Sequence, residues 1–308
     1  MVNEKIYEQV KQQVIKDARV MREINRTVPT SGERIDLPVQ DRQINIVYFR
    51  AKREHAPLIL GFHGGGFLFG GNAMNDAMWS AVRDALEVNV ASVEYRKSPD
   101  YRYKEALDDA YDAAVYMKNH AEEFGFDENR ISVMGCSAGA GLAATVCLHA
   151  KEKGGVLFQN QILMYPFLDA STDPDSKGEG NVGGPIAYVF NELHCTPTEA
   201  KLPIVSPVFA SLEELQGLPH AIFCMADHDS LKGEGYQYAE MLKKAGVPVS
   251  VSEYENMPHG FFEVGFGIIT DKDLEFLGEE MAERVHSGEA AGASEKALDF
   301  VKKNLRIQ

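Results

Sequence analysis

The chain has 308 residues and a formal net charge of −15, with 44% hydrophobic and 25% charged residues. These proportions are typical of a globular protein with a sizeable core, and they exclude the disordered and fibrous classes. An acidic chain without a Lys/Arg-rich run is unsuited to a nucleic-acid backbone. The expected partner is therefore a small uncharged or weakly polar substrate.

The N-terminal segment mixes charged and apolar residues throughout. It contains neither the apolar centre of a signal peptide nor a spanning segment, so we predict a cytoplasmic protein without membrane insertion. The four cysteines are Cys136, Cys147, Cys195 and Cys224, and they form no CxxC pair. The sequence therefore predicts reduced thiols, with neither a disulfide framework nor a zinc site.

Strand-like and helix-like segments alternate along the chain, as judged from the spacing of apolar residues. The predicted strands cover 43–49, 57–62, 89–95, 130–134, 161–165, 221–225 and 249–254. The predicted helices cover 4–24, 106–117, 140–150, 236–245, 271–286 and 294–305. Strands separated by amphipathic helices indicate βαβ units, so we predict a single α/β domain over 1–308 with a mostly parallel sheet.

Residues 173–184 (DPDSKGEGNVGG) interrupt this alternation, because Gly, Pro, Asp and Ser favour a flexible loop. We interpret about 170–203 as an excursion over the active site, and we expect it to form a helical cap together with residues 1–35. The loop is predicted to be a mobile gate, with the apolar segment 185–193 packing over a ligand. A passive surface loop is the alternative.

Ser137 lies in the segment Gly135-Cys136-Ser137-Ala138-Gly139, which has the GxSxG form. A strand-like segment precedes the motif and a helix-like segment follows it. This context is expected for a nucleophile elbow, in which a serine sits on a tight strand-to-helix turn. The motif is weak by itself, and an ordinary Gly-flanked turn is the alternative.

A second motif, HGGGF at 63–67, follows the predicted strand at 57–62. Consecutive glycines allow backbone N–H groups to point at a developing oxyanion without obstruction by side chains. A phosphate-binding loop does not fit, because no Gly-Lys-Ser/Thr segment closes the motif and no GxGxxG spacing is present. A plain flexible turn is the remaining alternative.

Five segments resemble, in order, the motifs of the hormone-sensitive-lipase-like family of esterases: HGGGF at 63–67, YRKSP at 95–99, GCSAGA at 135–140, DSL at 229–231 and HGF at 259–261. The resemblance extends over nearly the whole chain. It implies an α/β-hydrolase fold, with a mostly parallel central sheet flanked by helices and a helical cap. It also implies a serine carboxylesterase (EC 3.1.1 type) that acts on short-acyl esters, from acetyl to about hexanoyl, without a metal or organic cofactor.

The resemblance also assigns roles to individual residues. Ser137 matches the family's nucleophile, His259 its general base and Asp229 the acid that orients the histidine. Asp227 stands two residues earlier and is the competing acid. The acid-x-Leu pattern and the chain order Ser, Asp, His favour Asp229.

By the same resemblance, the backbone amides of Gly64, Gly65 and Ala138 would form the oxyanion hole, whose donors stabilise charge in the tetrahedral intermediate. His63 would fix the glycine loop instead of acting in catalysis. The predicted partner is then a small-molecule ester, with no nucleic acid and no membrane insertion. A homo-oligomer is left open.

The chain departs from the family pattern next to the nucleophile. Cys136 stands where the family commonly has Asp before the serine, and Ala140 replaces the last glycine of the motif. We interpret Cys136 as a packing residue, because only Ser137 occupies the apex of the elbow. These departures leave open which subfamily the chain belongs to.

Two other functions are compatible with the same three residues. An acyltransferase would pass the acyl group to an alcohol other than water, and a peptidase would cleave an amide. A non-catalytic ligand-binding hydrolase fold is a further alternative. The presence of Ser137, Asp229 and His259 together argues against it, since a receptor has no need of all three.

Overall fold

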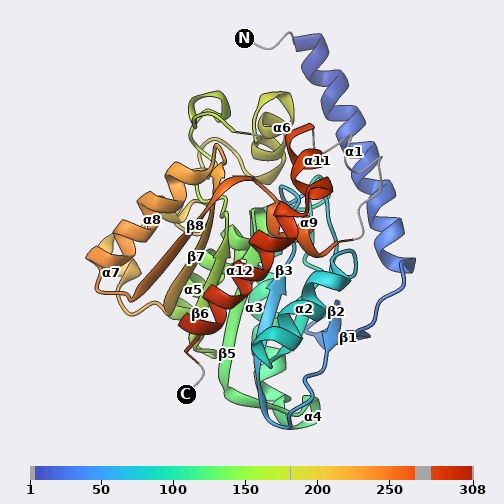
Figure 1. The fold of residues 1–308 in the computed structure, drawn as a ribbon, viewed down its shortest axis with the longest axis vertical. Coiled ribbons are helices and arrows are strands. Elements are labelled where there is room, and N and C mark those ends of the chain that lie inside the picture. The colour runs from blue at the N-terminus through green and yellow to red at the C-terminus, as the bar shows by residue number, and fades with distance from the viewer. Residues whose placement is uncertain (1–3, 181, 268–278, 307–308) are drawn as a thin grey trace.

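A computed structural model describes residues 4–180, 182–267 and 279–306 (Figure 1). Its centre is an eight-stranded sheet with the spatial order β1-β2-β4-β3-β5-β6-β7-β8. The strands are β1 (Glu33–Val39), β2 (Arg42–Phe49), β3 (Ala56–Phe62), β4 (Asn89–Val93), β5 (Phe126–Cys136), β6 (Asn160–Met164), β7 (His220–His228) and β8 (Val249–Pro258). Strands β3 to β8 pair in parallel, whereas β1 and β2 are antiparallel to their neighbours. The predicted α/β-hydrolase architecture is confirmed.

Helices cover both faces of this sheet (Figure 1). They are α1 (Glu4–Thr27), α2 (Asp76–Leu86), α3 (Tyr103–Asn119), α4 (Ala121–Phe124), α5 (Ala138–Lys153), α6 (Gly184–His194), α7 (Leu212–Leu215), α8 (Lys232–Lys244), α9 (Phe261–Phe266), α11 (Glu279–His286) and α12 (Glu289–Asn304). Side chains of α3, α5 and α8 pack in one core cluster, and those of α2, α9 and α12 pack in a second. Alternate residues of β5 enter the two clusters, Val133 the first and Met134 the second. A strand buried on both faces reads as a continuous apolar segment, which is why it was recognisable in the sequence.

Each of the seven predicted strands overlaps an observed one, but β1 was missed. Its residues alternate between exposed and buried only over its last half, ending in Leu37 and Val39, so the period-two signal is short. Residues 33–35, assigned above to the cap, lie in β1. The C-terminal helix begins at Glu289 and not at residue 294, because Ala-rich 289–293 continues the helix. Of the helix predicted over 271–286, residues 271–278 lie outside the described residues.

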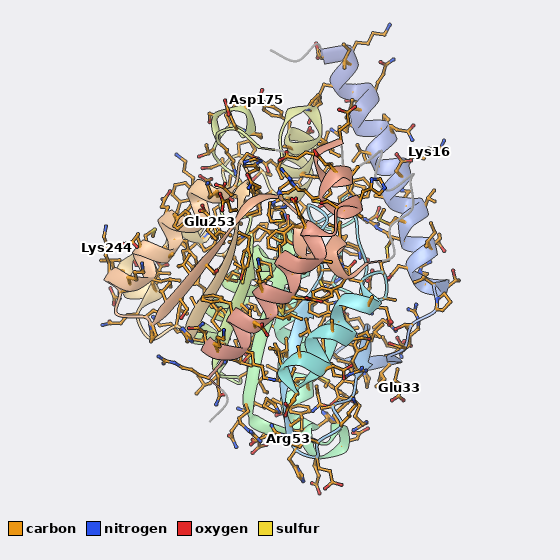
Figure 2. All side chains as sticks on the ribbon, viewed as in Figure 1. Lys16, Glu33, Arg53, Asp175, Lys244 and Glu253 are labelled. Atoms are coloured by element: carbon orange, nitrogen blue, oxygen red, sulfur yellow. The ribbon has the colours of Figure 1, made fainter. Side chains whose placement is uncertain are left out.

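Helix α1 lies outside the sheet and runs beside α6 along one side of the molecule (Figure 1). Its apolar stripe buries Val14 and Ala18 in a small cluster with Leu68, Phe69 and Val189. Lys16 points to solvent from the opposite face of the helix (Figure 2). The predicted amphipathic helix therefore packs against both α6 and the segment that follows the glycine loop.

The loop predicted as a gate, residues 173–184, is anchored near its middle by an ion pair. Asn181 of this loop lies outside the described residues. The Lys177 ammonium lies 2.7 Å from the Glu234 carboxylate of α8, and both side chains are buried. Nearer the surface, the Tyr188 hydroxyl of α6 donates to Asp173 and to Asp175, which lies at the outer edge of the molecule (Figure 2). No local pattern predicts this buried ion pair, because its partners are 57 positions apart along the chain.

Candidate active site

Ser137 occupies the turn between β5 and α5 with φ 54° and ψ −119°, a conformation that residues with a side chain rarely adopt. The backbone of this turn passes very close to other backbone segments. A Cβ atom at Gly135 would lie 2.1 Å from the Gly139 carbonyl oxygen, and one at Gly139 would lie 2.1 Å from the Phe62 carbonyl oxygen. The two glycines of the motif are thus required by packing, as the nucleophile elbow predicts.

The structure brings Ser137, His259 and Asp229 together from three separate strand ends. Ser137 Oγ lies 2.7 Å from His259 Nε2, and His259 Nδ1 lies 2.8 Å from Asp229 Oδ2. Asp229 is buried and also accepts the backbone N–H of Leu231 through Oδ1 at 2.9 Å. These distances allow proton transfer between the serine and the histidine, with the carboxylate fixing the orientation of the ring.

The pKa of His259 is set by two opposing effects. Burial lowers the pKa, but the charge of Asp229 and the hydrogen bond to that carboxylate raise it by a larger amount. The pKa of His259 therefore lies above its ordinary value. A raised pKa makes the neutral ring a stronger base. It also moves the acid limit of a His259-dependent reaction to a higher pH than an unperturbed histidine would give.

Asp227, the competing acid, forms no hydrogen bond or ion pair with His259. Its carboxylate accepts a hydrogen bond from Lys232 Nζ at 2.6 Å, and its side chain is 28% exposed. Asp227 lies within β7, whereas Asp229 follows the last residue of the strand, so the alternation of side chains along the strand does not extend to Asp229 and the two aspartates have different neighbours. Asp229 is the aspartate that lies against His259.

The glycine loop lies beside Ser137, but its amides differ in what they contact. The Gly64 N–H donates to Glu263 Oε1 at 3.3 Å. The amides of Gly65, Gly66 and Ala138 have no acceptor among the described residues, although their residues line the cavity that contains Ser137. Of the three amides predicted for the oxyanion hole, that of Gly64 is therefore already used within the protein.

His63 holds the glycine loop, as its predicted structural role requires. It is completely buried, its Nδ1 lies 2.8 Å from the Gly64 carbonyl oxygen, and its ring stacks on Tyr95. The Tyr95 hydroxyl donates to the His63 carbonyl oxygen at 2.7 Å. Burial lowers the pKa of His63 to about 3, so the ring is neutral at ordinary pH.

Glu263 is a site residue that the sequence reasoning missed. It lies in α9, four residues after His259, and is enclosed between the glycine loop, Asn75 and Tyr165. Asn75 Nδ2 donates to its carboxylate at 2.9 Å, and the Tyr165 hydroxyl does so at 3.5 Å. Burial raises the pKa of Glu263 despite the nearby His259 and these donors. The sequence contained no local signal for it, because His259 precedes α9, whose N-cap residue is Gly260, and the two residues therefore do not share a helix face.

A cavity of about 580 Å³ lies above Ser137 and His259. Its walls are mostly apolar, with phenylalanines from the segment after the glycine loop, from the segment after β6 and from α6: Phe67, Phe69, Phe167 and Phe190. The apolar segment predicted to pack over a ligand supplies Ile186 and Ala187 as well as Phe190. A mostly apolar cavity with a few polar groups is typical of a small-molecule site.

The described part of the chain contains neither a metal-binding cluster nor a membrane-spanning helix. No group of three or more His, Cys, Asp or Glu side chains in 4–180, 182–267 and 279–306 could hold a metal ion. Within the same ranges, no helix has the length and apolar character needed to span a membrane. Cys136 is buried, and burial raises the pKa of its thiol well above its ordinary value, which agrees with a packing role.

The sequence between residues 59 and 263 matches the alpha/beta hydrolase fold family. The carboxylesterase NlhH of Mycobacterium tuberculosis is 31% identical over 83% of this chain and 80% of its own length. The chain belongs to this family. The esterase LipI of the same organism is 33% identical over 67% of this chain and 66% of its own, and the arylesterase of Saccharolobus solfataricus is 30% identical over 75% and 77%. The resemblance to hormone-sensitive-lipase-like esterases and the predicted class, a serine carboxylesterase, are confirmed.

Solved structures extend the similarity to nearly the whole chain. A thermostable esterase from Pseudomonas putida ECU1011 superposes with a TM-score of 0.79 at 26% identity, over 97% of this chain and 92% of that one. A hyperthermophilic esterase from Pyrobaculum calidifontis gives 0.72 at 27% identity, over 95% and 92%. Both are α/β-hydrolase relatives of this family member.

Proposed function

We propose that this family member hydrolyses short-acyl carboxylic esters through an acyl-enzyme on Ser137. The observation that carries the proposal is the hydrogen-bonded series Ser137, His259 and Asp229, with distances of 2.7 and 2.8 Å, at the base of an apolar cavity. A serine hydroxyl is a poor nucleophile until a neighbouring base accepts its proton. His259 is within reach to do so.

In the first half-reaction, Ser137 Oγ attacks the ester carbonyl carbon while its proton passes to His259 Nε2. The tetrahedral intermediate collapses when the protonated histidine gives that proton to the departing alcohol. Water then attacks the acyl-enzyme and loses a proton to His259. The protonated histidine returns this proton to Ser137 Oγ as the second tetrahedral intermediate collapses to the acid and the free serine. Asp229 keeps Nδ1 protonated and stabilises the positive ring between the two transfers.

The oxyanion of this intermediate needs donors that are not engaged elsewhere. Gly65 and Ala138 meet that condition, and we assign them to the hole. The Gly64 amide donates to Glu263, so we replace it in the proposed hole by the neighbouring Gly66. Gly64 then acts as the point at which Glu263 anchors the loop.

The cap is proposed to consist of α1 and about residues 170–203. Support comes from the position of α6, whose Ile186, Ala187 and Phe190 line the cavity, and from the packing of α1 against α6. Within a volume of about 580 Å³, an acyl chain from acetyl to about hexanoyl and its alcohol would both be accommodated. A cytoplasmic location stays a prediction from the sequence.

The test is a panel of nitrophenyl esters from acetate to decanoate, assayed with the wild type, Ser137→Ala and Cys136→Ala. The wild type should be most active at hexanoate or shorter. Ser137→Ala should lose at least about 10³-fold in kcat, whereas Cys136→Ala should stay within about threefold of the wild type. Near-normal activity of Ser137→Ala would exclude Ser137 as the nucleophile. Parallel assays with nitroanilides and with added alcohols distinguish a peptidase and an acyltransferase from a hydrolase.

A further inference from the structure

The last turn of α6 places a histidine in the wall of the cavity. His194 is 4% exposed, and its ring stacks on Phe67 at 3.8 Å with an interplanar angle of 13°. It lines the same cavity as Ser137 and His259. Burial lowers the pKa of His194 to about 3, so the ring is neutral at ordinary pH.

Neither ring nitrogen of His194 has a hydrogen-bond partner in the part of the chain that the structure describes. Nδ1 is sealed from solvent and unpaired, whereas Nε2 is not sealed. Buried polar groups almost always have partners, so an unpaired buried imidazole calls for a physical explanation. None of the interactions that hold the fold accounts for it.

The tautomer of the ring follows from the cost of leaving each nitrogen unpaired. A neutral imidazole carries one N–H donor and one acceptor nitrogen. A buried N–H without an acceptor is rarer in proteins than a buried acceptor without a donor. The proton therefore belongs on Nε2, the nitrogen that is not sealed, and His194 offers a donor to the cavity.

Asn191 adds a second polar group to the same wall. It lies three residues before His194, on the same face of α6, and it lines the cavity. Its side-chain amide has no hydrogen-bond partner within the described ranges. The neighbouring wall, formed by Phe67, Phe167 and Ala187, is apolar. Two unpaired polar groups in an apolar wall are the arrangement that fixes a ligand's orientation.

We propose that His194 determines specificity by donating a hydrogen bond from Nε2 to an acceptor oxygen on the substrate, away from the ester that is cleaved. Asn191 supports the same oxygen. The favoured substrates are uncharged esters that carry a second oxygen function, such as an ether, a ketone or a hydroxyl group. This inference rests on the esterase function proposed above.

A carboxylate in that position is disfavoured. The neutral His194 supplies no positive charge to balance it. The only ammonium among the described cavity-lining residues, that of Lys177, is already paired with Glu234 at 2.7 Å. Removing a charged group from water without a counter-charge is costly. An uncharged oxygen needs only the donor that His194 provides.

The experiment compares esters that differ by one atom. 4-Nitrophenyl 3-methoxypropionate is paired with 4-nitrophenyl pentanoate for the acyl side, and 2-ethoxyethyl acetate is paired with pentyl acetate for the alcohol side. For each pair, the ratio of kcat/KM for the ether ester to that for the hydrocarbon ester is measured. Intrinsic reactivity contributes equally to every variant, so a change in the ratio reports the enzyme's contact with the oxygen.

His194→Phe keeps a ring that can stack on Phe67 but removes both nitrogens. It should lower the ratio about tenfold for the pair whose oxygen reaches position 194, as expected for the loss of one hydrogen bond to a substrate. His194→Gln retains a donor and should keep most of the ratio, whereas His194→Met, of similar length, should not. Phe190→Leu is the matched control, because Phe190 lines the same cavity without a polar atom. It should change both members of a pair equally.

An unchanged ratio in His194→Phe for both pairs overturns the inference. If that variant fails to fold, equal ratios in His194→Gln and His194→Met overturn it instead. Folding is followed by circular dichroism and by turnover of nitrophenyl acetate, whose acyl group is too short to carry the second oxygen. A wild type that cleaves none of the four esters would instead refute the proposed function.

Discussion

The floor and the roof of the cavity are held together by different kinds of contact. In the floor, Ser137 sits on a turn where Gly135 and Gly139 bring backbone against backbone with no room for a Cβ atom. The roof is held by side chains: Val14 of α1 and Val189 of α6 pack in one small cluster. The floor therefore tolerates almost no change of shape, whereas the roof can adjust its side chains one by one.

The contacts of the roof differ greatly in strength. The ion pair between Lys11 of α1 and Glu192 of α6 measures 2.6 Å, but Glu192 is 48% exposed, and such pairs contribute about 0–1 kcal/mol. Burial of Val14 is worth about 1.5–3 kcal/mol. The apolar cluster thus dominates. We therefore expect changes in the floor to alter turnover and changes in the roof to alter substrate preference.

The largest effect is expected from Asp229→Asn in the floor, which should lower kcat by about 10³- to 10⁴-fold because the histidine loses both its orientation and its counter-charge. Asp227→Asn is the matched control and should stay within about threefold, since Asp227 contacts Lys232. The kcat values of the two variants, measured by steady-state kinetics, determine which aspartate acts as the acid. The reverse ranking would assign the acid role to Asp227.

The same variants also test the pH dependence. Activity requires neutral His259, whose pKa is raised above the ordinary value for histidine, so kcat/KM of the wild type should rise as pH increases through that pKa. Asp229→Asn removes the charge that raises the pKa, and the acid limb of its profile should move to lower pH. A limb that does not move would mean that another group controls it.

Glu263→Gln should have a smaller effect, about tenfold in kcat. The neutral amide can still accept the Gly64 N–H, but it loses the charge that strengthens the hydrogen bonds from Gly64 and Asn75. Glu255→Gln is the control, because Glu255 is an exposed carboxylate on β8. Equal kcat values for the two variants would remove Glu263 from the support of the oxyanion hole.

In the roof, Val14→Asp should shift the preferred acyl length by changing the packing of α1 on α6, with changes of a few-fold in KM. Lys16→Asp is the control, since Lys16 points to solvent (Figure 2). Deleting the helix is a harsher test and should stop at residue 20, because Asn25 is buried and accepts the Ala73 N–H. Unchanged selectivity in folded Val14→Asp would mean that α1 only covers the fold.

The smallest effect is expected from Gly183→Ala at the start of α6. Gly183 has an extended φ of −176°, and a Cβ atom there would meet nothing within 4 Å. If the segment after Lys177 hinges, kcat and KM should change together, by about twofold. If the loop is passive, both should stay within error, and the gating prediction should be dropped.

The sequence by itself determined the parallel strands and the positions of Ser137, Asp229 and His259 next to strand ends. Those features are encoded locally, in short apolar segments and in turns whose glycines are required within a few residues. Sequence pattern could also anticipate that the apolar segment 185–193 contributes to the cavity wall, since its apolar character is local.

Tertiary structure decided which aspartate lies against His259, why the Gly64 amide is engaged, and which polar groups face the cavity. Glu263 contacts Gly64 across 199 positions, and Lys177 contacts Glu234 across 57. His194 is a pocket residue only because α6 folds over Phe67. Such contacts depend on how distant segments pack, and a pattern that repeats every two or four residues carries no information about them.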